Sequence, residues 1–232
     1  MARSFQRRRN FLRCAIYALI GACLLSAGAA ALLRFVDPPV TSVMLLEPGA
    51  VSALDYRWVS RGQIAEPAAR AVIAAEDQRF LAHHGLDFSQ IRNAVEAWRR
   101  GGELRGASTI TQQVAKNVYL WNGRSFVRKT IEAWLAILID VLVPKDRQLE
   151  IYLNIAEFGP GIFGIEAAAV HYFGRPAAQL RAHEAASLAA VLPNPRRMSA
   201  NPPGEYVRLR RREILEQMGV LEERGHFTGL SW

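Results

Sequence analysis

Cysteine is scarce in this chain, and the two that it has, Cys14 and Cys23, both lie in one apolar run near the N-terminus. The rest of the sequence therefore offers no thiol for a disulfide or a zinc site. The five histidines add no metal signature, because they lack a Cys/His or His-Glu-x-x-His spacing. Internal repeats are also absent, and the alanine-rich apolar run is the one tract of low complexity. These absences exclude disulfide scaffolds, zinc modules and repeat architectures.

A second long uncharged run is missing as well, because charged residues are spread throughout Leu54 to Trp232. This distribution is typical of a folded globular body and argues against a polytopic membrane protein. A length of 232 residues supports one sizeable domain, or one domain plus an anchor. The net charge of +8 predicts an anionic partner, which could be nucleic acid, a membrane surface or a phosphorylated substrate. Charge alone does not choose among them.

The apolar run, Cys14 to Leu33, is twenty uncharged residues long, enough for a helix to cross a hydrocarbon core of ~30 Å. It is preceded by Arg3, Arg7, Arg8, Arg9 and Arg13. The positive-inside rule therefore predicts a cytoplasmic N-terminus, with the remainder of the chain outside. A cleaved signal peptide is the alternative, since Ala27-Gly28-Ala29 offers small residues near a cleavage point. An uncleaved anchor is favoured, because the run exceeds the ~7–15 apolar residues of a usual signal.

Glycine and proline positions divide the remaining sequence into mostly helical segments. We predict a basic cytoplasmic segment over 1–13, a transmembrane anchor over 14–33, a linker containing Pro38-Pro39 over 34–53, and one domain over 54–232. A short strand is predicted over 40–46. Helices are predicted over 67–80, 88–99, 109–120, 126–143, 146–154, 162–173, 182–192 and 205–218.

Glu76 is the first candidate catalytic residue. In its predicted helix it shares a face with Val72, Phe80 and His83. Burial beside apolar groups disfavours a charged carboxylate and raises its pKa, which suits a general base near neutral pH. The alternative is a structural carboxylate that is capped, or paired with Arg79 or a histidine. His83 is itself typical of a helix-end hydrogen-bonding group.

A second candidate site lies on the predicted helix over 109–120. One line along this helix is apolar and consists of Ile110, Val114 and Val118. A different line is polar and consists of Ser108, Gln112 and Lys116. Ser108 is placed to cap the helix, and free backbone N–H groups at a helix N-terminus also bind phosphate or sugar oxygens. Without a ligand, the same residues would be a cap, a solvated face and a surface charge.

The third candidate region combines a basic cluster with a carboxylate. Arg124, Arg128 and Lys129 precede Glu132, and an almost wholly apolar segment runs from Ile131 to Val143, which we expect to be buried. Because Arg128 and Glu132 are four residues apart, they could form an ordinary helix ion pair worth ~0.3–0.5 kcal/mol if exposed. The same groups also fit a clamp for a pyrophosphate.

Two further sets of polar residues are expected to be mainly structural. One set builds the helix over 146–154 and the loop after it: Lys145, Glu150, Tyr152 and Asn154. The other forms a solvated face of the last helix: Arg208, Arg210, Arg211 and Arg212. Near a membrane, such a basic face would also attract anionic headgroups.

These segments also resemble the signatures of one family, the peptidoglycan glycosyltransferases (glycosyltransferase family 51). Residues 76–85, Glu76-Asp77-Gln78-Arg79-Phe80-Leu81-Ala82-His83-His84-Gly85, resemble its pattern E-D-x-x-F-x-x-H-x-G. Residues 106–117 resemble its G-x-S-T-I-T-Q-Q-x-x-K-N, residues 128–132 its R-K-x-x-E, and residues 145–154 its K-x-x-I-L-E-x-Y-L-N. Segments 168–174 and 184–189 are similar too, so the resemblance covers Leu54 to Pro203. Ala107 replaces a glycine common in the family.

The resemblance implies a mainly α-helical, lysozyme-like domain and a role for each candidate residue. Glu76 would deprotonate the 4-hydroxyl of the acceptor sugar, and Asp77 would support the substrate site beside it. Glu132 would be the second catalytic carboxylate, which orients or protonates the leaving group or helps to hold a metal ion. The remaining residues would contact sugar or pyrophosphate oxygens of the substrate: Ser108, Thr109, Gln112, Gln113, Lys116, Arg124, Arg128 and Lys129.

By the same resemblance, the substrate is lipid II, and the product is a β-1,4-linked glycan strand with release of undecaprenyl pyrophosphate. A divalent cation, magnesium or manganese, would be bound mainly through that pyrophosphate, and no protein ligand can be named for it. The expected partners are lipid II, the lipid-linked nascent glycan and the membrane. Other cell-wall synthesis and division proteins could join them, whereas nucleic acid is not expected. The expected location is the bacterial plasma (inner) membrane, with the domain on the periplasmic side.

Bifunctional relatives in this family carry a transpeptidase domain after the glycosyltransferase. The ~30 residues beyond Pro203 are too few for such a domain, because domains usually need at least ~50. Between the first two motifs, the segment Leu86 to Arg105 places apolar residues near helical spacing: Phe88, Ile91, Val95 and Trp98. The resemblance implies that this segment is a membrane-facing jaw. The alternative is a helix packed on the core of the domain.

Two other functions fit part of the pattern. A lysozyme-like hydrolase would also use a partly buried glutamate, but it needs neither the cationic set nor a membrane location. A degenerate module that merely scaffolds cell-wall enzymes would tolerate the loss of Glu76, Glu132 and the basic residues, yet all are present. A glycosyltransferase accounts for the whole pattern.

Overall fold

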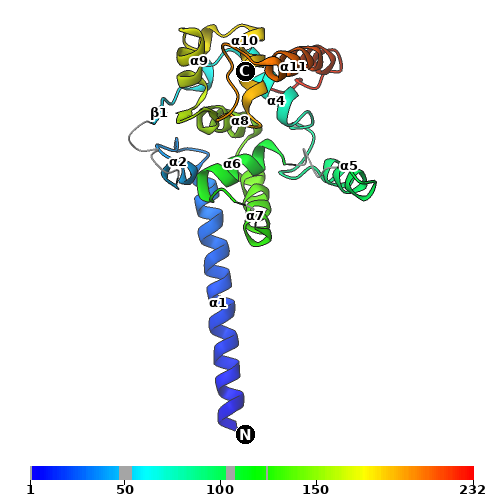
Figure 1. Ribbon diagram of the computed structural model, residues 1–232. Helices are drawn as coiled ribbons and strands as arrows, with labels where there is room; N and C mark the ends of the chain where they lie inside the picture. The colour runs from blue at the N-terminus through cyan, green and yellow to red at the C-terminus, as the bar shows by residue number, and fades with distance from the viewer. Residues whose placement is uncertain (1, 47–53, 103–107, 124) are drawn as a thin grey trace.

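One long helix, α1 (Ala2–Leu32), projects from the rest of the chain in Figure 1. The computed structural model describes residues 2–46, 54–102, 108–123 and 125–232. Within α1, the 24 residues from Arg9 to Leu32 are long and apolar enough to cross a membrane, and only 6% of their most apolar window is buried. This helix agrees with the single anchor predicted from the sequence.

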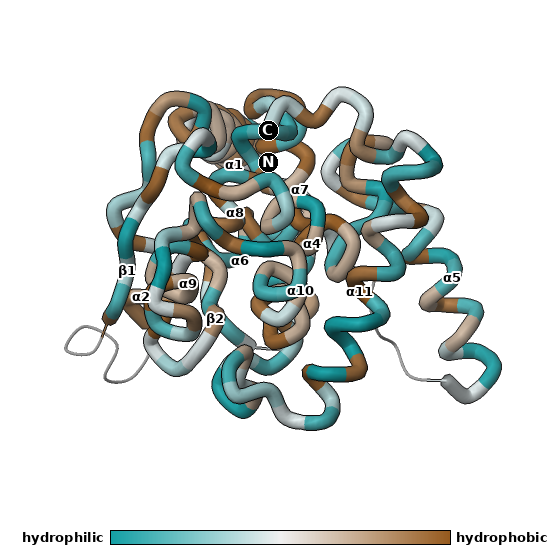
Figure 2. The backbone as a smooth tube through the Cα atoms, turned by 90° about the horizontal axis from the view of Figure 1, so that it is seen from above, coloured by the Kyte–Doolittle hydropathy of each residue, from teal (hydrophilic) through white to brown (hydrophobic). Residues whose placement is uncertain are grey.

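The body is built mainly from helices, as predicted. Helix α10 packs against both α4 and α11, while α6 packs against both α7 and α8. The view from above in Figure 2 shows α10 among these neighbours and α5 at the edge of the body. The described helices are α2 (Ser42–Leu46), η1 (Arg61–Gln63), α4 (Glu66–Glu76), α5 (Phe88–Arg99), α6 (Ile110–Tyr119), α7 (Phe126–Leu142), α8 (Lys145–Ile155), α9 (Ile165–Phe173), η2 (Ala177–Gln179), α10 (Ala182–Val191) and α11 (Glu205–Glu223).

Three body helices hold the C-terminal end of α1. On α7, the indole Nε1 of Trp134 donates to Ser26 Oγ over 3.2 Å. On α6, the hydroxyl of Tyr119 donates to the Ala29 carbonyl over 2.6 Å. On α8, Arg147 Nε donates over 3.0 Å to the carbonyl of the residue that follows the helix. The anchor is therefore fixed to the same helices that carry the candidate site.

A small sheet lies at one side of the body, with strand order β1-β3-β2. Its strands are β1 (Asp55–Tyr56), β2 (Glu157–Gly159) and β3 (Ile162–Phe163). Strand β3 pairs in parallel with β1 and in antiparallel with β2. The helix predicted over 162–173 is therefore wrong at its start. Gly164 separates β3 from α9 at φ +87°, where an added Cβ would lie 2.5 Å from the Asn154 carbonyl oxygen, so a helix cannot run through it.

The short strand predicted over 40–46 is also wrong, because Ser42–Leu46 forms helix α2. Thr41 Oγ1 accepts from the Met44 amide over 3.3 Å and so favours a helical turn over an extended chain. Val43 and Met44 are buried. Much of the predicted linker over 34–53 is thus structured, and its residues 47–53 lie outside the described residues.

Helix α7 is less buried than its apolar sequence predicts. Its buried face includes Leu135, Ala136 and Ile139. Its other face is exposed, and includes Val127, Ile131, Trp134, Ile137 and Val141. The prediction that the segment is buried all round is therefore wrong. This exposed apolar face belongs to a helix that packs beside α1.

Candidate active site

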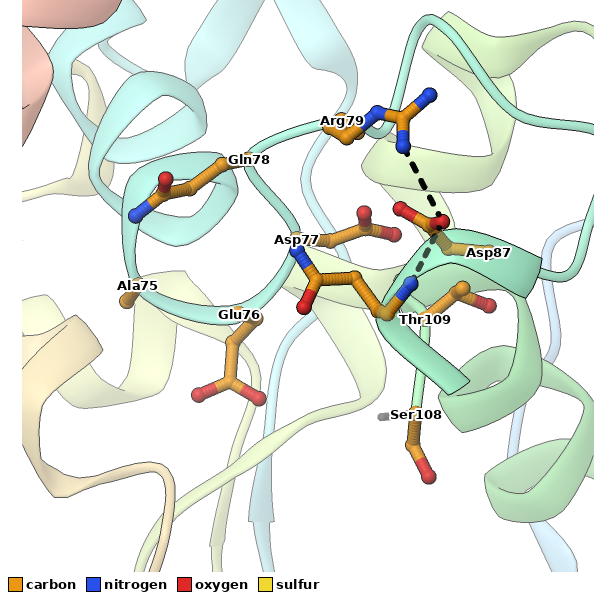
Figure 3. Close-up of a pocket in the computed structure, with 9 residues that line it drawn as sticks. Ala75, Glu76, Asp77, Gln78, Arg79, Asp87, Ser108 and Thr109 are labelled. Atoms are coloured by element: carbon orange, nitrogen blue, oxygen red, sulfur yellow. Dashed lines mark hydrogen bonds and ion pairs between the residues drawn. The ribbon is translucent and has the colours of Figure 1, made fainter. Parts of the chain in front are cut away.

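Glu76 is the last residue of α4, four residues earlier than the predicted helix end. It lines a cavity of about 200 Å³ with parts of the α4–α5 loop and the start of α6 (Figure 3). The lining residues are Ala75, Glu76, Asp77, Gln78, Arg79, Asp87, Gln90, Ser108 and Thr109. In Figure 3 the carboxylates of Glu76 and Asp77 point in different directions. Two adjacent acidic residues thus have separate surroundings.

Burial raises the pKa of Glu76, the direction predicted from the sequence. The adjacent Asp77 also raises this pKa. A hydrogen bond from Gln113 Nε2 to Glu76 Oε2, 2.8 Å long, and the charges of Arg210 and Lys116 act in the opposite direction. The alternative pairing with Arg79 or a histidine is not seen among the described residues. Glu76 is therefore a partly buried carboxylate whose ionised form is supported by neighbours.

Asp77 has a structural role in the site. Its carboxylate accepts from the backbone N–H of Ile110 over 3.0 Å and lies 2.9 Å from His83 Nε2. These contacts draw the chain out of helix α4 after Glu76, which is why the helix predicted to reach residue 80 stops early. They also invalidate the helical spacing used to align Glu76 with Phe80 and His83, although both of those side chains are buried.

Thr109, rather than Ser108, caps helix α6. Thr109 Oγ1 accepts from the Gln112 N–H over 3.1 Å, and Gln112 Oε1 accepts from the Thr109 N–H over 3.0 Å. This reciprocal pair is a capping box. Thr109 also donates to the carbonyl of Gly85 over 2.6 Å. The predicted cap at Ser108 is therefore wrong, and Thr109 and Gln112 have structural hydrogen bonds at positions expected to bind substrate.

The basic cluster is organised around Glu132. The carboxylate of Glu132, 2% exposed, accepts from both Arg128 Nη1 and Lys129 Nζ. Lys129 Nζ also donates to the hydroxyl of Ser108 over 2.9 Å, which links α7 to the start of α6. The predicted ion pair between Arg128 and Glu132 is confirmed. Arg124, the remaining predicted member, lies outside the described residues.

Lys116 interacts electrostatically with the carboxylates of both Glu76 and Glu132. Burial lowers its pKa, Glu132 and Glu76 raise it, and Arg128 and Lys129 lower it. Among the described residues, no hydrogen bond or ion pair engages its ammonium group. A partly buried cation with unused donors is suited to an anionic ligand.

Sequence reasoning missed two residues near Glu76. Arg210 on α11 donates from Nη2 to the Ala75 carbonyl over 3.2 Å, and its charge favours the ionised form of Glu76. The solvated role predicted for Arg210 is therefore wrong. Tyr152 on α8, which was expected to be mainly structural, donates its hydroxyl to Gln113 Oε1 over 3.0 Å. Both contacts cross the fold, so no local pattern signals them.

The other residues of the α8 motif have the structural role predicted for them. The Asn154 amide bonds to both the N–H and the carbonyl of Val59. Lys145 pairs with Asp140 over 2.7 Å and lies over the Phe80 ring. These contacts hold the loop after Glu76 and the segment that follows β1 on helix α8.

The sequence of residues 46–219 matches the model of a family described as Transglycosylase. The chain belongs to this family. Among its curated relatives, the biosynthetic peptidoglycan transglycosylase of Shewanella oneidensis is 47% identical over 209 residues, covering 88% of this chain and 90% of that protein. The protein of the same name from Aeromonas hydrophila is 49% identical over 207 residues, covering 88% of each. That from Pasteurella multocida is 49% identical over 197 residues, covering 82% and 80%.

This transglycosylase does not offer a protein cage for a metal ion in its described residues. No group of three or more His, Cys, Asp or Glu side chains gathers there. The carboxylates near the cavity are also engaged, since Asp77 bonds to Ile110 and His83, and Glu132 to Arg128 and Lys129. The residues therefore do not fit a metal held by the protein alone.

Replacing Arg210 with Met should raise the pKa of Glu76 further, because a positive charge that favours the carboxylate is lost. The carboxyl ¹³C shift of Glu76, assigned by its absence in Glu76→Gln, can be followed against pH in micelles. Arg210→Lys, which keeps the charge, and Arg212→Met, at an exposed position on the same helix, are the controls. An unchanged titration in Arg210→Met would show that Arg210 has no electrostatic influence on Glu76.

Proposed function

We propose that this transglycosylase polymerises lipid II into β-1,4-linked glycan strands and releases undecaprenyl pyrophosphate. The observation that carries the proposal is the placement of Glu76, a carboxylate with a raised pKa, beside the Lys116, Arg128, Lys129 and Glu132 group. Glycosyl transfer needs a base for the acceptor hydroxyl and positive charge for the departing pyrophosphate. The names of the relatives support the same assignment.

In this mechanism Glu76 takes the proton of the acceptor 4-hydroxyl. Glu76 Oε2 already accepts from Gln113, whereas Oε1 accepts no hydrogen bond from the described residues, so Oε1 is the oxygen we assign to the acceptor. The acceptor oxygen forms a bond to the anomeric carbon, and the bond from that carbon to the pyrophosphate breaks with inversion. The electron pair leaves with the pyrophosphate.

The basic residues stabilise the charge that develops on this leaving group. Lys116 donates no hydrogen bond to any of the described residues and so can contact the pyrophosphate directly, while Arg128 and Lys129 are aligned by Glu132. We therefore assign Glu132 to holding two cations in place rather than to proton transfer. A divalent cation would enter with the pyrophosphate and share its charge, and the mechanism assigned to the chain does not depend on it.

The membrane arrangement follows from α1. We propose that the helix crosses the plasma membrane once, with the arginine-rich N-terminus in the cytoplasm and the body outside. The exposed apolar face of α7 lies beside this helix. Helix α5 exposes Phe88 by 70% and Trp98 by 58%, and buries only Ala94, so the alternative of a helix packed on the core is disfavoured. We assign α5 to the bilayer surface, where lipid-linked substrate would enter.

Glu76→Gln should abolish polymerisation of labelled lipid II, with a loss of at least ~10²-fold, because the amide cannot take a proton. The variant should not be less stable than the parent at pH 7.5. A carboxylate whose pKa is raised by folding costs stability once pH exceeds the unfolded value, and the amide removes that cost. Product sizing and thermal unfolding measure both effects. Near-normal polymer from the folded Glu76→Gln variant would refute the role of Glu76 as the base. If the parent protein gave shortened glycan and no polymer, the activity would be that of a hydrolase.

Lys116→Met should lower the polymerisation rate by roughly 10²-fold, since it removes a charge directed at the leaving group. Arg212→Met, which removes an exposed charge, should change the rate less than twofold, because exposed charges are screened beyond a Debye length of ~8 Å. Initial rates at matched lipid II concentration give the comparison. Equal losses in both variants would point to general membrane electrostatics and contradict the clamp.

Nitroxide labels on α5 should report insertion at the membrane surface. Phe88→Cys and Trp98→Cys, made in a background with Cys14 and Cys23 replaced by Ser, would be labelled and the full chain placed in nanodiscs. Both labels should be more accessible to oxygen than to a water-soluble nickel chelate, because apolar side chains of an interfacial helix enter the acyl boundary. Leu209→Cys on α11, also exposed, is the control. Equal accessibility at all three positions would contradict a membrane contact of α5.

A further inference from the structure

A chain of hydrogen bonds connects the buried interior of α8 to the candidate base. The Tyr152 hydroxyl donates to Gln113 Oε1 over 3.0 Å, and Gln113 Nε2 donates to Glu76 Oε2 over 2.8 Å. Three helices meet at this chain, since Tyr152 lies on α8, Gln113 on α6 and Glu76 at the end of α4. Each step uses a donor and an acceptor of the correct kind.

We propose that Tyr152 is a positioning residue for the glycosyl transfer, because its hydroxyl holds the Gln113 amide where that amide donates to Glu76. The inference rests on the proposed function of Glu76 as the base. Tyr152 itself is 1% exposed, and Gln113 stands between it and Glu76 in the hydrogen-bond chain. It therefore acts through Gln113 and not by touching the reacting atoms.

The direction of the two hydrogen bonds matters because an amide has two different ends. If the Gln113 oxygen faced Glu76, two oxygens bearing negative charge would be opposed and the ionised base would be disfavoured. A donor that satisfies this oxygen on the far side keeps the NH₂ group directed at the carboxylate. Burial, together with the charges of Glu76 and Asp77, raises the pKa of Tyr152 well above its usual value. The phenol therefore keeps its proton and remains a donor throughout the working pH range.

Other charged groups also face Glu76, and none of them can replace this contact. Lys116 approaches from α6, Arg210 from α11, and Asp77 is the next residue in the chain. The two cations act through space, whereas Gln113 is the residue that donates a hydrogen bond to the Glu76 carboxylate among the described residues. Loss of Tyr152 should therefore change the protonation of Glu76 even with both cations in place.

The test is the pH dependence of kcat/KM for lipid II polymerisation by the full chain in micelles. Tyr152→Phe should move the acid limb upward by about half to one pH unit, because the ionised base loses support. Tyr172→Phe is the matched control, since Tyr172 is also buried and its hydroxyl donates to the Phe158 carbonyl over 3.2 Å, in a different part of the body. Its acid limb should stay at the parental pH.

A double-mutant comparison separates a positioning role from a merely structural one. Gln113→Leu alone should also move the acid limb upward, and Tyr152→Phe added to it should cause no further shift, because Tyr152 acts through Gln113. Additive shifts would show that Tyr152 acts by another route. A uniform loss of rate at all pH values in Tyr152→Phe, with an unmoved limb, would overturn the proposal and leave Tyr152 a packing residue.

Two further measurements keep the result decisive. Site-specific 3-fluorotyrosine at position 152 preserves the shape and makes the hydroxyl a stronger donor, so the limb should move to lower pH even if Tyr152→Phe fails to fold. The carboxyl ¹³C titration of Glu76 should show the same shifts without requiring turnover. A parent that makes no polymer would refute the proposed function, whereas an active parent whose Glu76 titration ignores Tyr152 would refute only this inference.

Discussion

The buried carboxylate of Asp77 is the contact on which the site depends. It accepts from the first N–H of α6 and from His83, and so joins the end of α4 to the start of α6 and to the loop between them. A buried carboxylate is stable only when such donors satisfy it. The preceding residue, Glu76, is left at a helix end with one oxygen unpaired by the described residues. Asp77 thus has a structural role, and it leaves Glu76 available for the role of base that we propose.

The site also balances two opposite charges in a partly buried setting. Burial raises the pKa of Glu76 and lowers that of Lys116, so each group is shifted toward its neutral form. Each charge in turn supports the other. In the proposed mechanism, this pair is costly for the empty protein and becomes useful when a hydroxyl and a pyrophosphate are bound. The two groups lie on different helices, Glu76 on α4 and Lys116 on α6, and the core fixes the positions of both helices.

Sequence patterns predicted the local features well and the contacts across the fold poorly. The helices over 88–99 and 126–143 and the ion pair of Arg128 with Glu132 follow from spacing within one segment. The raised pKa of Glu76 was predicted in the right direction, but from a helical spacing that ends at Glu76. The cap at Thr109 is a capping box with Gln112, three residues on, which the local sequence could have predicted. The early end of α4 and the place of Arg210 instead depend on partners 33 and 135 residues away. Helical periodicity contains no information about such partners. The exposed face of α7 was not predicted, because the sequence pattern of an apolar helix is the same whether or not other protein segments cover it.

In the proposed membrane arrangement, the docking of α1 makes the bilayer part of the scaffold. Its apolar stretch of 24 residues would be about 36 Å long at 1.5 Å per residue, longer than a ~30 Å hydrocarbon core, and a helix in that position adapts by tilting. Because Trp134, Tyr119 and Arg147 fasten the C-terminal end of α1 to three body helices, the body would tilt with the helix. Membrane thickness would then set the tilt of α1, and with it the angle at which the cavity faces the lipid surface.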